Sequence, residues 1–417
     1  MERYTGLIGI LLLLGIAYLC SENRKAISLR LVLSGLALQM LFALLILKIS
    51  WVTRFFALLG SGMSKLEQFA TQGAAFVFGG LMVGNTSDSA MPYGSPNTFV
   101  FAFSVTATII FVCVLVALCY QLGILQRIVS LLAKSMNRIM RVSGAEALSN
   151  VASAFVGQVE AQVMIQPYLN RMTRSELLAS MTGSMACIAG GILIVYVNMG
   201  AKAEYLLAAS IMAAPGALVI SKILIPETEI SETSGIVKLK VEKPYANTID
   251  AVSHGAAEGM KIALNVIAML IGFIALISLI NYGLGALGGM ANWCPQLSLN
   301  FIFAKVFYPI AWCMGASGSD TETVAMLMGQ KLSINEFVAF DTLTHKLNHP
   351  LSDKAHAIVS FAICGFANFA SVGMQIGGIG TLAPEKRHVI AKLGLKALLG
   401  GTLASYLSAS IAGILIG

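Results

Sequence analysis

Residues 149–169 read SNVASAFVGQVEAQVMIQPYL, and they place one glutamate and three glutamines in a run of small and apolar residues. The four polar side chains are Gln158, Glu160, Gln162 and Gln166. In the hydrocarbon core of a membrane an unpaired charge costs about 2.5 kcal/mol or more, so it must face a cavity or a partner. The meaning of this stretch therefore depends on the solvent that surrounds it.

Composition identifies that solvent as lipid. Of the 417 residues, 57% are hydrophobic and 11% are charged, whereas soluble domains usually carry about 25% charged residues. The mean hydropathy is +0.81. Apolar runs near the roughly 20 residues of a membrane-spanning helix recur along most of the chain. The sequence predicts an all-α polytopic membrane protein.

The apolar runs predict eight membrane spans, near 5–20, 29–49, 97–122, 177–199, 204–225, 259–290, 355–382 and 389–416. The first is expected to be an uncleaved helix, because Tyr18 and Leu19 before Cys20 are too bulky for a signal-peptide cleavage site. The lysines and arginines cluster in short loops on one side of these spans, so the net charge of +7 indicates membrane topology rather than nucleic-acid binding. That side is taken as cytoplasmic. Both termini are then predicted to face outward from a bacterial inner membrane.

One segment between the spans predicts a helix on the membrane surface. Residues 124–142 place Arg127, Lys134, Arg138 and Arg141 on one helical face, opposite isoleucine and leucine. Such a helix is typical of an element that lies on the anionic cytoplasmic surface.

Two apolar segments interrupted by polar residues, 144–170 and 298–330, each precede a span broken by small residues. The broken spans contain MACIAGG at 185–191 and CGFANFAS at 364–371, and a plain span follows each. The two copies start on opposite sides of the membrane, which is the pattern of an inverted repeat with its binding site where the broken elements meet. The predicted division is a scaffold with an interfacial helix (1–143), a first repeat (144–226), a cytoplasmic linker with a scaffold helix (227–297) and a second repeat (298–417).

The polar residues of the broken elements predict a solute site. Gln158 and Glu160 follow Gly157, which permits a turn, and a second pair of acids lies at Asp320 and Glu322. The alternatives are a structural hydrogen-bond cluster between helices for the first group and a solvated hairpin tip for the second. Carboxylates and amides without an arginine suit an uncharged, hydroxyl-rich solute better than an anion.

A competing constellation would bind zinc. Asp341, His345 and His349 are spaced to share one face of a helix, which would suit a metal site in a membrane-embedded metalloenzyme. Pro350 interrupts that helix, and the stretch is better explained as a solvated outer loop. The catalytic motifs HExxH and GxSxG are absent, as is the nucleotide-binding Walker motif, so no enzyme is predicted.

An ordered set of motifs resembles the concentrative nucleoside transporter family over nearly the whole chain. The set is GQVEA (157–161), AGG (189–191), LAASIMAAPGAL (207–218), NEFVAF (335–340), CGFAN (364–368), IGTLAP (379–384) and GTLASYLSASIAG (401–413). The resemblance implies a homotrimer whose protomers have eight spans and two re-entrant hairpins, similar to 144–170 and 298–330. It also implies a symporter that imports nucleosides on an ion gradient. The alternatives are transport of another ribosyl or sugar-like solute and a gate-like channel.

The resemblance also implies the site residues. Gln158 and Glu160 would contact the nucleobase, and Val159 lies between them at the tip. Asp320, or Glu322 beside it, would bind ribose hydroxyls, because counting back from NEFVAF without gaps reaches these acids. The remaining implied contacts are the polar residues Asn368 and Ser371 and the apolar residues Phe366 and Ile192.

Ion coupling would use positions behind the first tip. The resemblance assigns sodium to the side chains of Ser153 and Cys187 and the carbonyls of Val156 and Ile188. A thiol is a poor ligand for a hard cation, and protonation of Glu160 or Asp320 is the alternative to sodium. The first hairpin departs from the family pattern at three positions. Val159 replaces a residue with a hydroxyl group, Gln162 replaces a proline, and Gln166 replaces an arginine.

Overall fold

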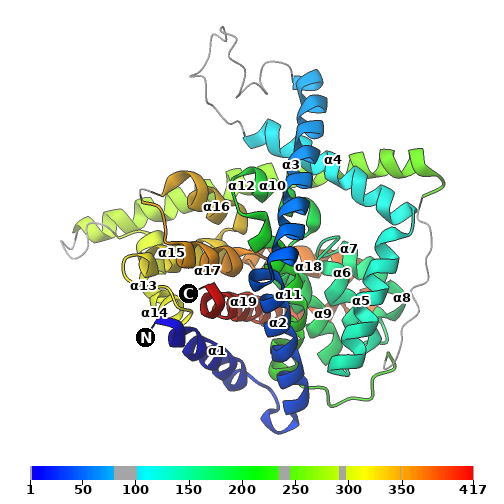
Figure 1. Cartoon of the computed structure of the whole chain (residues 1–417), viewed down its shortest axis with the longest axis horizontal. Coiled ribbons are helices and arrows are strands. Elements are labelled where there is room, and N and C mark those ends of the chain that lie inside the picture. Colours follow the sequence, from blue (N-terminus) through cyan, green and yellow to red (C-terminus); the bar gives the residue numbers. More distant parts are fainter. Residues whose placement is uncertain (1, 79–100, 234–244, 291–296, 348, 417) are drawn as a thin grey trace.

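The computed structural model describes the chain except residues 1, 79–100, 234–244, 291–296, 348 and 417. The described residues form helices and connecting loops without a strand, as Figure 1 shows. Among the described residues, four helices are long and apolar enough to cross a membrane: α2 (Leu29–Lys48), α11 (Ala203–Leu224), α12 (Thr248–Met290) and α19 (Arg387–Ile416). The prediction of an all-α polytopic membrane protein is confirmed.

The other predicted spans fall on α1, on α4 or on interrupted helices. The first lies on α1 (Glu2–Leu19) and the third on α4 (Phe101–Gln121), with residues 97–100 of the third outside the described residues. The fourth and seventh lie on the broken pairs α9 (Arg174–Ala186) with α10 (Gly190–Asn198) and α17 (Asp353–Ile363) with α18 (Phe369–Leu382). A helix that crosses in two pieces is too short in each piece to be recognised by length alone.

One layer of the molecule is built from α3 (Ser50–Phe78), α4 and α12, with α12 running along α4 (Figure 1). Most of α12 is exposed in the single chain, including Ile271, Leu279 and Leu287. In water such an apolar surface would be covered, so it must face lipid or other copies of the chain.

The predicted interfacial helix is α5 (Ile124–Met140), which follows α4 after a bend of 74°. Its buried face includes Val129, Ala133 and Met136, while Arg138 and the residue that ends the helix, Arg141, are exposed. A helix of this amphipathic pattern, turned away from the preceding span, is suited to lie along a membrane surface.

The same order of elements occurs twice. In the first unit α6 (Gly144–Ser153) turns into the short helices α7 (Glu160–Met164) and α8 (Gln166–Leu169), and α9, α10 and α11 follow. In the second unit α15 (Asp320–Ser333) turns into α16 (Glu336–Asp341), and α17, α18 and α19 follow. The turn of the second unit, between α15 and α16, therefore lies at Ile334 and Asn335.

The segment 298–330, expected to correspond to 144–170, therefore contains more than the equivalent of α6. It holds α13 (Leu299–Val306), α14 (Tyr308–Cys313) and most of α15. The side chain of Asn335 accepts a hydrogen bond from Val338 N and begins α16, which places a helix start inside the NEFVAF motif.

The two helix breaks cross each other. Phe366 N, between α17 and α18, donates to Cys187 O, between α9 and α10, at 3.3 Å. Gly365 has a φ of +122°, and a Cβ there would lie 2.4 Å from Ala186 O. Only glycine permits both this conformation and this approach.

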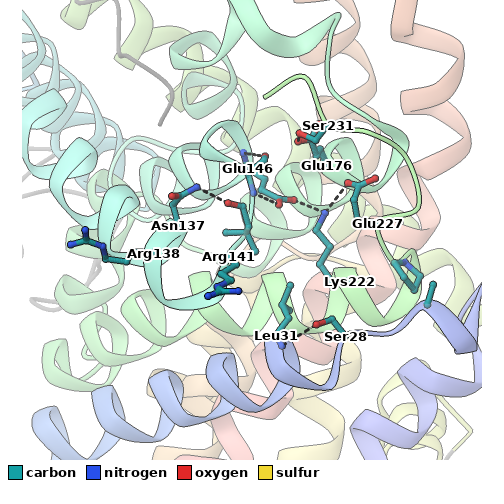
Figure 2. A pocket seen from close by; sticks show the side chains of 14 residues that line it. Ser28, Leu31, Asn137, Arg138, Arg141, Glu146, Glu176, Lys222, Glu227 and Ser231 are labelled. Atoms are coloured by element: carbon teal, nitrogen blue, oxygen red, sulfur yellow. Dashed lines mark hydrogen bonds and ion pairs between the residues drawn. The ribbon is translucent and has the colours of Figure 1, made fainter. Parts of the chain in front are cut away.

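A polar cluster joins one end of α6 to one end of α11. Lys222 of α11 pairs with Glu146 at 2.8 Å and with Glu227 at 3.2 Å, and Figure 2 shows it between the two carboxylates. The three residues line a cavity of about 530 Å³. This ion-pair set joins the start of α6 to the end of α11.

Beside it, Glu176 joins α9 to the segment that follows α11. It forms a capping box with Thr173 and accepts hydrogen bonds from the hydroxyls of Ser231 and Thr233. Burial raises the pKa of the Glu176 carboxyl, but these hydrogen bonds outweigh burial and hold the pKa below its usual range. The ionised carboxylate therefore stabilises the fold.

Glu176→Gln keeps the capping box and removes the charge, so it tests this electrostatic contribution. We expect a loss on the order of 2 kcal/mol near neutral pH. Because the folded-state pKa is lowered, this stability is present above the unfolded value of about 4.3 and is lost as the pH falls from there through the lower folded-state value. Thermal unfolding of the detergent-solubilised protein at about pH 7.5 and about pH 3 should show that the stability difference between variant and wild type is smaller at the lower pH. Glu229→Gln, on an exposed residue of the same segment, is the control. A difference that stays constant with pH would contradict the interpretation.

Candidate solute-binding site

The first tip is the turn between α6, which ends at Ser153, and α7, which begins at Glu160. It faces α18. Gly157, with a φ of +124°, makes the turn, and the Glu160 carboxylate folds back so that a Cβ on Gly157 would lie 2.6 Å from its Oε2. Gln158 Nε2 contacts Met374 Sδ at 3.7 Å. Val159 packs on Gly378 of the same helix. Gln158 and Val159 are thus held against α18, and the Glu160 carboxylate lies on the turn beside them.

The second half of the site forms around a buried carboxylate, Glu336, at the start of α16. Its Oε1 accepts from Tyr196 Oη of α10 at 3.1 Å, and its Oε2 accepts from Asn368 Nδ2 at 2.9 Å. Tyr196 is in turn fixed by stacking on Phe340 and by an edge contact with Phe337. Glu336 therefore joins the second tip to both broken helices.

Asn368 and Ser371 connect the two halves through α18. Asn368 Oδ1 accepts from Ser371 N at 2.8 Å and caps α18, on which Met374 lies one turn further along. Buried polar atoms remain without a hydrogen-bond partner among the described residues, and they include Gln158 Oε1, Ser371 Oγ and Asn335 Nδ2. Unsatisfied buried polar atoms are uncommon in proteins, so their presence on the elements that meet here suits a site that a ligand completes.

The structure brings most of the predicted site residues to these elements but separates the two acids of α15 from them. Asp320 accepts from Ser352 N at 3.2 Å and Ser352 Oγ at 2.6 Å, so it holds α15 to the start of α17. Glu322 is exposed and pairs with Lys305 at 2.9 Å. Phe366 is buried beside the break, and Ile192 is partly buried on α10.

Glu336 was missed by the sequence analysis, although it lies within the NEFVAF motif that carried the resemblance. The sequence analysis looked for the ribose-binding acid upstream of this motif and so did not consider the glutamate within it. The signal that could have identified it is a single glutamate between Ile334 and Phe337, since an acid inside an apolar run is expected to face a partner or a cavity.

A network of hydroxyls centred on Gln162 lies behind the first tip. The Gln162 amide nitrogen donates to Ser149 Oγ at 3.0 Å and Ser184 Oγ at 2.8 Å, and its oxygen accepts from Ser180 Oγ at 2.6 Å. Ser149 and Ser180 also contact each other at 2.6 Å. The network joins α6 and α7 to α9, whereas Gln166 is exposed. Gln162 is therefore a structural residue of the tip, and Gln166 is not.

The positions expected to hold sodium lie at the edge of this network, and their chemistry does not fit that ion. Ser153 Oγ donates to Ser149 O at 2.8 Å and lies 2.9 Å from Ser184 Oγ. Cys187 is fully buried, and its sulfur contacts the carbonyls of Asn150 and Ser210 at 3.9 Å. Sodium prefers several convergent oxygen ligands, as hard cations do, whereas this set offers a hydroxyl already engaged and a thiol. Val156 and Ile188 would contribute carbonyls only.

The zinc constellation is not assembled. Asp341 pairs with Lys346 at 2.6 Å and with His345 Nδ1 at 3.2 Å, while His349 is exposed beyond the helix. Within the described part of the chain, no group of three or more His, Cys, Asp or Glu side chains is placed to hold a metal ion.

Replacing Gln162 tests the structural role of the network. Gln162→Leu should lower the stability of the protein by about 1–3 kcal/mol, because Ser149, Ser180 and Ser184 lose a buried partner. Thermal unfolding in detergent measures this, with Gln166→Leu as the matched control on the exposed face. Equal effects of the two substitutions would contradict the assignment.

Comparison with known proteins identifies the family. Models described as Na+ dependent nucleoside transporter N-terminus, Nucleoside recognition and Na+ dependent nucleoside transporter C-terminus match residues 8–81, 102–203 and 205–413. The putative nucleoside permease NupX of Escherichia coli is 38% identical over 100% of both chains, and the nucleoside permease NupC of Helicobacter pylori is 38% identical over 98% of this chain and 97% of its own. The structure of CNTnw in an inward-facing substrate-bound state matches with a TM-score of 0.93 at 38% identity, covering 100% of this chain and 98% of that one. The chain therefore belongs to the Na+-dependent (concentrative) nucleoside transporter family and is a membrane transporter rather than an enzyme.

Proposed function

We propose that this protein imports nucleosides across the bacterial inner membrane, driven by an ion gradient. The observation that carries the proposal is the buried Glu336 carboxylate, held between Tyr196 and Asn368 where the second tip meets both broken helices. Carboxylates and amides offer paired acceptors and donors to an uncharged solute rich in hydroxyls. Another ribosyl or sugar-like solute would satisfy the same chemistry and is the alternative substrate class.

The two halves of the site suit the two parts of a nucleoside. On the first tip the Gln158 amide and the Glu160 carboxylate are suited to donors and acceptors on a base edge, with Val159 as an apolar neighbour. On the second side Glu336, Asn368 and Ser371 would bind ribose hydroxyls. Phe366 and Ile192 would supply apolar contact. Glu336 takes the role expected of Asp320, because Asp320 is engaged by Ser352.

The transport cycle we propose moves the tips and broken helices against the scaffold of α4 and α12. The two tips would be re-entrant hairpins that enter the membrane without crossing it, and both chain termini would lie outside the cell. The exposed apolar face of α12 supports assembly as a homotrimer, since copies of the chain could cover it.

For ion coupling we propose the proton. Sodium is the ion in the family description, but the engaged hydroxyl of Ser153 and the thiol of Cys187 do not suit it. Glu160 is an exposed carboxylate at the solute site and would be the group that takes up the proton.

The site assignment predicts different outcomes for two acids. Glu336→Gln should lower uptake of radiolabelled uridine or adenosine into proteoliposomes by roughly tenfold or more, because hydrogen bonds to a charged acceptor contribute about 1.5–3 kcal/mol. Asp320→Asn is the matched control and should transport nearly normally. Size-exclusion chromatography would verify that both variants remain assembled. Loss of uptake in Asp320→Asn alone would contradict the assignment and restore the original expectation.

The coupling ion is tested by comparing gradients. At a fixed membrane potential, an inward proton gradient should drive accumulation of nucleoside, and an inward sodium gradient without a pH difference should not. Accumulation driven by sodium would refute proton coupling and would mean that the positions around Ser153 rearrange to bind that ion. Absence of nucleoside uptake under both gradients would overturn the substrate assignment.

A further inference from the structure

Two adjacent glycines of α18 lie in different surroundings, although glycine in either position destabilises a helix relative to alanine. A Cβ on Gly377 would have no heavy atom within 4 Å among the described residues, so this position is open. A Cβ on Gly378 would lie 2.7 Å and 2.8 Å from the two Cγ atoms of Val159 on the first tip. The missing side chain of Gly378 therefore leaves a socket in α18, which the side chain of Val159 fills.

Val159 cannot leave this socket by rotating its side chain. Both of its methyl groups face the place where a Cβ on Gly378 would lie, and its own Cβ is 3.4 Å from that place. Valine is branched at Cβ, so every staggered rotamer keeps at least one methyl group on the same side. A side chain at position 378 would therefore displace the backbone of the tip, because close-packed groups leave no other room.

The residues on either side of Val159 are the proposed base contacts. Gln158 Nε2 lies 3.7 Å from Sδ of Met374, one helical turn before Gly378, so two successive tip residues rest on one face of α18. The buried Gln158 Oε1 has no hydrogen-bond partner among the described residues, which leaves an acceptor for a ligand. Glu160 follows Val159 directly and begins α7, which also packs on α18. A shift of Val159 would move both polar neighbours with it.

We propose that Gly378 is a positioning residue for solute binding, which acts through Val159 by seating the first tip at the depth where Gln158 and Glu160 meet the solute. This inference rests on the proposed function, because it takes Gln158 and Glu160 as contacts of the base. Gly378 itself need not touch the solute, since its contribution is the space that it leaves for Val159. The side chain of Val159 serves as the anchor of the tip.

The test is equilibrium binding of radiolabelled uridine or adenosine to detergent-purified protein without an ion gradient. Gly378→Ala should raise the Kd about tenfold, the scale of losing one hydrogen bond to the solute. In protein that already carries Val159→Ala, the same glycine substitution should change the Kd by less than about twofold, because the smaller side chain leaves room for the new methyl group. Gly377→Ala, the matched control at the open position, should bind as wild type does.

A second ligand separates a displaced tip from general damage. The ratio of the Kd values for a nucleoside and its 3′-deoxy form should stay at the wild-type value in Gly378→Ala, because the proposed ribose contacts Glu336 and Asn368 are not moved. A changed ratio would overturn the proposal, as would fewer binding sites at an unchanged Kd, which is the result expected of a merely structural glycine. An equal loss of affinity with and without Val159→Ala would show that Gly378 does not act through Val159.

Thermal unfolding supplies the same comparison without a solute, and it decides the question if Val159→Ala binds too weakly to measure. Gly378→Ala should lower the melting temperature relative to Gly377→Ala in the wild-type background, because the new methyl group and Val159 compete for one space. In the Val159→Ala background the two glycine variants should melt alike, and a difference that persists there would refute the socket. Wild-type protein that binds no nucleoside would instead overturn the proposed function.

Discussion

The structure depends on the way two interrupted helices satisfy each other's backbone. A break leaves amide and carbonyl groups without intrahelical partners, and lipid offers none, so such backbone is tolerated only where protein covers it. Here one break covers the other, through the hydrogen bond from Phe366 N to Cys187 O and the close approach at Gly365. Asn368 then caps the next helix with its own side chain. Because the breaks must meet, the polar groups that flank them meet as well, and the candidate site follows from this crossing.

The turns before the breaks are held by two different kinds of polar chemistry. Behind the first tip, Gln162 and the serines of α6 and α9 form a neutral network in which the amide serves three hydroxyls. At the second tip, the carboxylate of Glu336 is fixed by a phenol and an amide. A fully satisfied neutral network gives rigidity, whereas a carboxylate surrounded by donors keeps acceptor capacity for a ligand. The first arrangement positions a tip, and the second lies within the candidate site.

The sequence alone was sufficient for those features that depend on the solvent and on local pattern. Apolar runs located the helices, and small residues around Cys187 and Gly365 marked the breaks, because lipid imposes length and backbone satisfaction on every span. Distinguishing Asp320 from Glu336 required the third dimension. Both are acids in largely apolar segments, and only packing shows that Ser352 engages one while Asn368 engages the other. Likewise the sequence marked Gln162 as a polar residue in an apolar run and as a departure from a family motif, but not as the centre of a network. Its role depends on serines brought from α9, which lies beyond a turn that hydropathy does not specify.

The two acids of the candidate site differ in their surroundings, and this difference bears on coupling. Glu336 is enclosed, and its two oxygens accept hydrogen bonds from Tyr196 and Asn368. Glu160 is exposed at the first tip, and the acid Glu258 of α12 is among its electrostatic neighbours. An exposed carboxylate is stabilised by water, but closing the site over a solute would remove that water and leave the charge uncompensated. Under the proposed function, movement of the loaded site would require a proton or a cation at Glu160. In that proposal the first tip would carry the coupling, and the second would carry the recognition of hydroxyls.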